Sequence, residues 1–157
     1  TVVLICEHTK DGAFGLVLNR PSENRLEDVL TGTLPERIRG DTLFAGGPVE
    51  PPALSYLHSD ATLLNGNVMD MVSVGHNLEE LIDLGNAWSP NQKLRVFAGY
   101  AGWAAGQLED ELKQNAWLTV EARDAILFDL PADERLPAAM ELLGLDFARL
   151  ADQAGHA

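Results

Sequence analysis

The sequence predicts an α+β fold, in which a mixed, mostly antiparallel sheet or a small barrel is flanked by helices. Residues 1–20 hold two strand-like runs around an Asp-Gly turn, the pattern of an antiparallel hairpin. Apolar residues at helical spacing recur later, and strands and helices mix without the strict alternation of a parallel sheet. The length of 157 residues favours one domain, which we expect at 1–150 with a frayed tail at 151–157.

In the N-terminal half, strands are expected wherever β-branched and aromatic residues run between turn residues. They cover 1–8, 13–20, a short run ahead of Gly46 and Gly47, 53–59, and one or two strands within 60–76. Pro21 ends the hairpin, and a short helix follows in NRLEDVL. Asn24 would cap this helix and Glu27 would complete a capping box. Its buried stripe would consist of Leu26, Val29 and Leu30.

In the C-terminal half, helices alternate with strands. NLEELIDLGN is the clearest helix, because Asn77 can cap it, Glu80 can complete a capping box and Gly85 can end it. Its inward face would hold Leu78, Leu81 and Ile82. A strand at 93–100 precedes a helix at 105–116, in which Glu109 is placed to pair with Lys113. Two strands, WLTVEA and AILFDL, lead to a helix in PADERLPAAMELLG, and DFARL would add a last turn.

The charge balance limits the partners of the chain. It carries 24 acidic residues against 11 Lys and Arg, a net charge of −13, whereas a protein that binds duplex DNA neutralises many phosphates with Lys or Arg. Only Arg37 and Arg39 come close to a basic cluster, so direct binding of nucleic acid is disfavoured. No apolar run approaches the roughly 20 residues that span a bilayer. No signal peptide opens the chain, so we expect a cytoplasmic protein without membrane association.

The search for chemistry yields no catalytic, cofactor or metal motif. The four histidines are far apart in sequence, and no Gly-x-Ser-x-Gly elbow is present. The single cysteine, Cys6, lies in an apolar run and is expected to be a buried structural thiol. We therefore expect no catalytic residues, no cofactor and no metal ligands, although the sequence does not exclude an enzyme.

The glycine-rich segment GYAGWAAG, ahead of the helix at 105–116, allows two interpretations. Its glycines match neither the dinucleotide fingerprint nor the P-loop. A bound anion at the helix N-terminus is one alternative, although the acidic residues at 109–111 would repel it. Close packing of the segment around Trp103 is the favoured interpretation.

Polar residues and glycines at strand ends and on the expected helix form a candidate functional surface. Arg20 stands out in it, because a planar guanidinium suits a carboxylate or a phosphate. The whole set is Glu7, His8, Asn19, Arg20, Gly46, Gly47, His58, Gly102, Trp103, Gln107 and Glu111.

Several blocks of the sequence resemble a known family. TVVLICEHTKDGAFGLVLNRP, FAGGPV, LH at 57–58, GYAGWAAGQLEDELKQNAWLTV and ILFDLPADERLPAAMELLGLD occur in the order and spacing of the AlgH (YqgE) family of bacterial proteins. The resemblance covers 1–150, and its most specific block runs from Gly99 to Glu109. It implies an unusual α+β sheet or barrel, and an upstream segment with a first strand that is missing here. Alanines replace the Ser or Gly that relatives often have in GYAGWAAG, which disfavours hydroxyl chemistry there.

The resemblance implies little about mechanism. Members of the family are commonly labelled transcriptional regulators, after a proposed role in the control of alginate genes, and no catalytic residues carry over. We favour a cytoplasmic, non-enzymatic regulatory or adaptor protein that acts through an unidentified protein partner. The alternatives are a small-molecule-binding protein or enzyme, with a pocket near Asn19, Arg20 and the Gly99–Gln107 loop, and direct DNA binding. The sequence also allows the protein to form a homo-oligomer.

Overall fold

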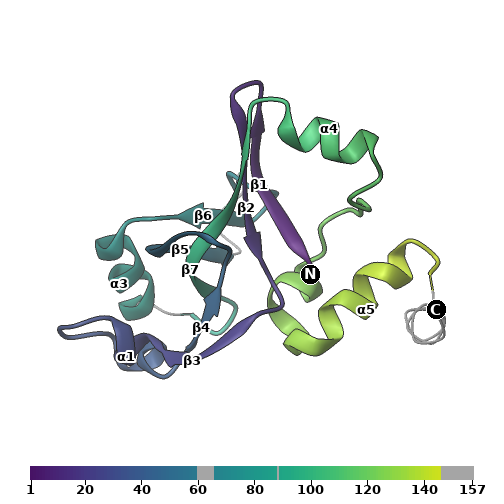
Figure 1. Cartoon of the computed structure of the whole chain (residues 1–157). Helices are drawn as coiled ribbons and strands as arrows, with labels where there is room; N and C mark the ends of the chain where they lie inside the picture. Colours follow the sequence, from purple (N-terminus) through teal and green to yellow (C-terminus); the bar gives the residue numbers. More distant parts are fainter. Residues whose placement is uncertain (60–65, 88, 146–157) are drawn as a thin grey trace.

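The structure, a computed structural model, describes residues 1–59, 66–87 and 89–145 (Figure 1). The fold is α+β, as predicted, and the described residues form seven strands in one open, mostly antiparallel sheet. Helices α1 and α3 lie on one side of the sheet in Figure 1, and α4 and α5 lie on the other. The first part of the expected strand region 60–76 (60–65), the expected last turn in DFARL and the tail at 151–157 lie outside the described residues.

The strands of the sheet are β1 (Val3–Thr9), β2 (Gly12–Val17), β3 (Pro21–Arg25), β4 (Thr42–Ala45), β5 (Val49–Ser59), β6 (Val72–Gly75) and β7 (Lys93–Ala104). The β1–β2 hairpin is antiparallel, as predicted. The sequence does not predict β3, because Pro21 reads as a terminator. Pro21 instead pairs with Phe44 on β4. Since β3 ends the strand order, the missing N–H of the proline is tolerated there.

Strand β7 is the centre of the sheet. Its first half, from Lys93 to Ala98, pairs with β5, and within it Val96 to Ala98 also pair with β4 on the other side. Its second half, from Ala101 to Ala104, pairs with β2. Only the β4–β7 pair is parallel among the described strand pairs. The strand extends four residues beyond the predicted end at 100, so Gly102 and Trp103 lie within a strand and not on a loop.

Glycines allow the chain after β4 to cross β7 at close range. Gly46 and Gly47 lie against β7 where Gly99 adopts a φ of +74°. A Cβ atom on Gly46 would lie 2.3 Å from the carbonyl oxygen of Gly99, and one on Gly47 would lie 2.2 Å from that of Tyr100. In the segment GYAGWAAG these contacts support close packing at Gly99, but a Cβ on Gly102 would meet nothing closer than the Tyr100 ring at 3.4 Å and one on Gly106 would meet nothing within 4 Å.

The sheet separates two clusters of buried apolar side chains. Successive residues of a strand point to opposite faces, and β7 accordingly places Val96 in one cluster and Phe97 in the other. The Val96 cluster is completed by Leu26, Ile38 and Leu81, which come from the helices on that face. The Phe97 cluster is completed by residues that include Ile126, Leu127, Phe128 and Ala139.

The helices are α1 (Leu26–Val29), α2 (Glu36–Arg39), α3 (Leu78–Asn86), α4 (Gln107–Lys113), η1 (Ala125–Asp129) and α5 (Ala132–Leu142). The sequence predicts α1, α3, α4 and α5 but not α2. Asn77 caps α3 as predicted, because its side chain accepts hydrogen bonds from the N–H groups of Glu79 and Glu80. Pro131 precedes α5, and Gly144 follows its end, also as predicted.

Several local predictions at α1 and α3 are wrong. The N-cap of α1 is Arg25 rather than Asn24, and Asp28 takes the place expected for Glu27 in the capping box. The predicted buried stripes fail at Val29 and Leu78, which are exposed, while Leu26 and Leu81 are buried. Gly85 does not end α3, because it lies inside the helix and allows close contact with Pro35 and Ile38.

The two strands predicted at WLTVEA and AILFDL are also wrong. The first segment is irregular, and the second forms η1, a single turn of π-helix. In η1 the consecutive residues Ile126, Leu127 and Phe128 are all buried. A short, continuous apolar run has no period that would tell a strand from a buried helical turn.

Candidate functional site

Glu111 is the centre of a hydrogen-bonded group at α4 that includes three residues of the predicted surface. Its Oε2 accepts hydrogen bonds from Trp103 Nε1 (2.9 Å) and Trp117 Nε1 (2.8 Å), and its Oε1 accepts one from Gln107 Nε2 (3.1 Å). Gln107 Oε1 in turn accepts from the N–H of Ala104 (2.9 Å). The hydrogen bonds from Trp117, Trp103 and Gln107 lower the pKa of Glu111 below its ordinary value. The group fastens α4 to the end of β7.

His8 lies at the same end of the molecule, where its Nε2 pairs with Glu109 on α4. The pKa of Glu109 is lowered by a hydrogen bond from its own backbone N–H and then by His8. Lys113, the predicted partner of Glu109, lowers that pKa only through its charge. Glu7, the neighbour of His8 on β1, is exposed.

Asn19 and Arg20 lie at the opposite end of the β1–β2 pair, where they hold the first residues of the chain. Asn19 Oδ1 accepts a hydrogen bond from the N–H of Val2 (3.0 Å), and Arg20 Nη2 donates one to Thr1 Oγ1 (2.8 Å). The two residues are therefore remote from the group at Glu111.

The remaining predicted residues lie inside the sheet. Gly46 and Gly47 pack against β7, and Gly102 pairs with Phe14 on β2. His58 is buried on β5, with its Nε2 3.7 Å from Glu80 Oε1 and its ring beside Tyr56. Burial and then Glu80 raise the pKa of Tyr56 to about 12.

The predicted set thus does not form one site. Trp103, Gln107 and Glu111 come together, and His8 on β1 pairs with Glu109 of the same helix, whereas Asn19, Arg20 and His58 lie elsewhere. Sequence reasoning missed Trp117 and Glu109 as members of the group at α4. Glu109 lies on α4 between Gln107 and Glu111, so the predicted helix was the available signal for it, whereas Trp117 lies beyond the end of α4 on an irregular segment, which has no helical spacing to indicate the contact.

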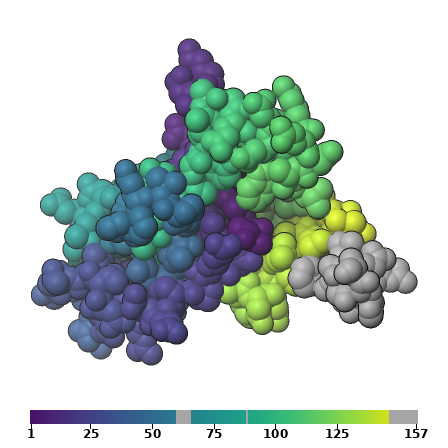
Figure 2. Space-filling model, viewed as in Figure 1, coloured from purple at the N-terminus to yellow at the C-terminus, as the bar shows by residue number. Residues whose placement is uncertain are grey.

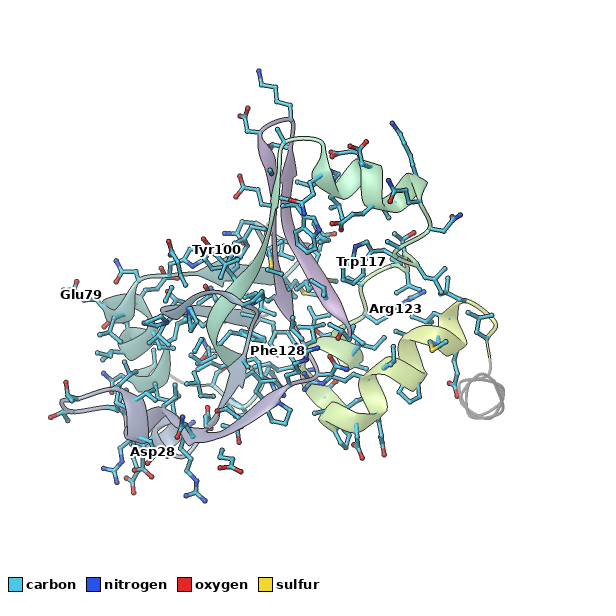
Figure 3. The ribbon with its side chains drawn as sticks, viewed as in Figure 1. Asp28, Glu79, Tyr100, Trp117, Arg123 and Phe128 are labelled. Carbon is cyan, nitrogen blue, oxygen red and sulfur yellow. The ribbon has the colours of Figure 1, made fainter. Side chains whose placement is uncertain are left out.

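An apolar groove about 660 Å³ in volume lies between β1, α4 and α5. Residues 1–5 line it consecutively, as do residues 116–123 on the irregular segment opposite. Side chains of Leu108, Met140 and Leu143 contribute from the two helices. In Figure 2, β1 (purple) forms the floor between the green and yellow parts of the chain. Figure 3 places Trp117 and Arg123 along the irregular segment.

The edge of β1 is exposed to this groove. Since β1 ends the strand order, only one of its edges pairs with a described strand. Consecutive residues of a strand point alternately to its two faces, so a cavity lined by all of residues 1–5 adjoins the strand edge. Around the groove, Ile5 and Val120 are more than one third exposed and Leu118 is 66% exposed. The sequence did not predict the groove, because one of its walls was read as a strand.

The titratable groups offer few reactive centres. Burial raises the pKa of the Cys6 thiol to about 12, so the sulfur is protonated at neutral pH and a poor nucleophile. Within the described ranges, no three His, Cys, Asp or Glu side chains come close enough together to hold a metal ion. None of the helices in these ranges combines the length and apolar character that crossing a membrane requires.

The fold and the groove define a class: a small α+β protein with an open sheet, whose edge strand faces an apolar channel. The family described as AlgH-like (DUF179) matches residues 1–148, and the chain belongs to this family. The family resemblance predicted from the sequence is therefore confirmed.

Relatives and solved structures are similar over all or most of the chain. A UPF0301 protein of Thiobacillus denitrificans is 45% identical, covering 100% of this chain and 87% of the relative. One from Azoarcus is 44% identical, covering 100% and 86%. The solution structure of the AlgH protein from Pseudomonas aeruginosa matches with a TM-score of 0.78 at 40% identity, covering 100% of this chain and 86% of that one. A crystal structure of a Corynebacterium diphtheriae protein, at 22% identity, shares the fold with a TM-score of 0.66, covering 84% and 71%.

Proposed function

We propose that this member of the AlgH-like family is a non-enzymatic regulatory or adaptor protein of the cytoplasm, and that it binds an extended segment of a protein partner in the groove beside β1. The observation that supports this proposal is the combination of an edge of β1 that pairs with none of the described strands and an apolar channel alongside it. The transcriptional role with which the family is labelled would then be exerted through a protein partner.

Strand addition explains how such a groove recognises a segment. An extended peptide beside β1 forms main-chain hydrogen bonds with the strand edge, and alternate side chains enter the apolar channel. Leu118 and Val120 are exposed on the wall opposite β1, where they would cover the far side of the peptide. The hydrogen bonds contribute affinity, and the apolar contacts select the sequence of the partner.

The charge supports a protein partner over DNA. With a net charge of −13 and a pI near 4.5, the chain repels a phosphate backbone at neutral pH. Direct DNA binding is accordingly not part of the proposal. The pocket considered near Asn19 and Arg20 is not part of it either, because those side chains hold the first residues of the chain.

Two leucines offer a matched test of the groove. Leu118 lines the groove and Leu78 lies on α3 away from it, and both are exposed. We expect immobilised wild type and L78K to capture the same partner from a lysate of the source bacterium, and L118K to capture it about tenfold less, because a buried lysine charge opposes the apolar contacts. Quantitative mass spectrometry measures the capture, and circular dichroism verifies folding of both variants.

Two results would contradict the proposal. One is the capture of no protein other than this chain itself. The other is equal capture of a partner by L118K and L78K, which would place the binding surface outside the groove.

A further inference from the structure

A polar cavity of about 510 Å³ lies at the start of β7, and none of its lining residues lines the apolar groove. It is bordered by the start of β7, the start of β4, helix α2 and the end of η1. Its charged lining consists of Arg37, Lys93, Arg95, Asp41 and Asp129. Three cations and two carboxylates line it, in a chain whose net charge is −13.

Arg95 is the side chain of this cavity whose hydrogen-bond donors are mostly unused by the described residues. A guanidinium carries five N–H donors, and among the described residues Arg95 uses one in a hydrogen bond, from Nη2 to the carbonyl oxygen of Phe128 (2.8 Å). Its Nε is buried and has no hydrogen-bond partner within the described ranges. Figure 3 labels Phe128, which lies between the sheet and α5. The side chain therefore holds unused donor capacity in a partly desolvated place, where an acceptor is stabilising.

A second arginine adds positive potential behind Arg95. The guanidinium carbons of Arg95 and Arg135 lie 4.5 Å and 5.2 Å from the centroid of the Phe44 ring. Arg135 is 1% exposed, and its partners among the described residues are the carbonyl oxygens of Leu18 and Leu130, to which it donates, and no carboxylate. Burial, and then the charge of Arg95, lower the pKa of Arg135 to about 10.

The carboxylates of the cavity neutralise only part of this charge. Asp129 is engaged by Lys93, whose Nζ also contacts Asp124 (2.9 Å and 2.6 Å). Asp41 and Arg95 influence each other through space, but no direct ion pair joins them in the described part of the chain. Burial raises the pKa of Asp41, and the charge of Arg95 acts against that rise.

We propose that this cavity binds a small oxyanion, the carboxylate or phosphate group of a metabolite, with Arg95 as its principal donor and Arg37 as a second cation. The planar fork of a guanidinium matches either group with two parallel hydrogen bonds. The volume falls within the range of small-molecule sites, about 300–1,000 Å³. The site is independent of the proposed partner groove, because the two cavities share no lining residue.

Helix α2 supplies a matched pair of variants for a test. Arg37 lines the cavity, whereas Arg39, two residues further on the same helix, does not line it and instead lies near Glu27. R37Q and R39Q each remove one positive charge from α2. Any difference between them in anion binding therefore reports a local contact and not the overall charge.

The experiment is an NMR titration of the ¹⁵N-labelled chain with sodium phosphate and, separately, sodium acetate, with sodium chloride holding the ionic strength constant. We expect saturable shifts of the amides at 93–96 and 128–129. R37Q should weaken the apparent affinity about five- to tenfold, the loss of one charge-assisted hydrogen bond, while R39Q stays within about twofold. R95K retains the positive charge but loses the planar guanidinium with its parallel N–H donors, so it should also bind the anion more weakly.

The two titrations distinguish the ligand class. Saturation by phosphate alone would show that the cavity binds a phosphate group, and saturation by acetate alone would show that it binds a carboxylate. The proposal is overturned if neither anion gives saturable shifts at these amides, or if R37Q and R39Q bind alike.

Discussion

At the scale of single residues, Glu111 determines how α4 is attached. One carboxylate accepts hydrogen bonds from two indole N–H groups and one amide, which come from β7, the segment after α4, and α4 itself. The two indole rings also meet edge to face, with their centroids 6.1 Å apart. Trp103, Gln107 and Glu111, which the sequence placed in the candidate functional surface, therefore have a structural role. Their hydrogen bonds hold α4, which forms one wall of the groove.

Replacing Glu111 by alanine should lower the thermal stability and loosen α4. The substitution leaves the N–H groups of Trp103 and Trp117 without their acceptor, and an unsatisfied donor in a partly buried place is destabilising. We expect a fall in Tm of several degrees by circular dichroism, together with a change in tryptophan fluorescence. E121A is the control, because the side chain of Glu121 is 79% exposed and its only described ion pair is with Arg123 at 3.4 Å. Equal Tm values for the two variants would contradict the role of Glu111.

The pH dependence of the same contact has a defined sign. The folded-state pKa of Glu111 is lowered below 4.5, with the hydrogen bond from Trp117 as the first cause. A lowered carboxyl pKa contributes stability that is fully present above the unfolded pKa and is lost as the pH falls through the folded pKa. The difference in unfolding free energy between wild type and E111Q should therefore shrink as urea titrations move from pH 7 to below pH 4.5. A difference that grows in acid would oppose this assignment.

At the scale of elements, the crossing of Gly46 over β7 is a close backbone contact at the end of β4. G46A would place a Cβ atom 2.3 Å from the Gly99 carbonyl oxygen, so the chain must shift. We expect the unfolding free energy to fall by about 2 kcal/mol or more, the range of an overpacked core position. G40A is the matched control, because a Cβ there meets nothing within 4 Å, and it should change stability by less than about 0.5 kcal/mol. Urea unfolding of both variants provides the comparison.

The elements that could be predicted from the sequence are those whose own residues include a turn or capping signal. The β1–β2 hairpin has its Asp-Gly turn, and α3 has Asn77, whose side chain caps two backbone N–H groups. The elements that it misses depend on tertiary contacts. The π-helical turn η1 is set by burying Ile126, Leu127 and Phe128 together against the sheet, and no periodicity within five residues encodes that.

The same distinction applies to the two cavities. Arg37 and Arg95 are 58 positions apart in the sequence and reach one cavity only because α2 and β7 pack together. The groove requires an irregular course for residues 116–123, where β-branched residues predict a strand. By contrast, Gln107 and Glu111 are one helical turn apart, so their meeting could be predicted from spacing alone.

At the scale of the whole molecule, excess negative charge opposes the compact state. The net charge of −13 produces self-repulsion, which salt screens over a Debye length of about 8 Å at physiological ionic strength. The ion pairs that salt would weaken, such as those of Lys93 and Arg39, are substantially exposed and contribute little. We therefore expect Tm to rise between about 0.01 M and about 0.15 M sodium chloride.

The charge variant K10E isolates this effect of repulsion. Lys10 is exposed in the β1–β2 turn, so its reversal moves the net charge by two units, from −13 to −15, without altering a buried contact. The low-salt Tm of K10E should lie below that of wild type, and the two values should converge as sodium chloride is added, because screening removes the added repulsion. Differential scanning calorimetry at fixed pH measures both curves. A Tm that falls with salt in both proteins would mean that the ion pairs outweigh the repulsion.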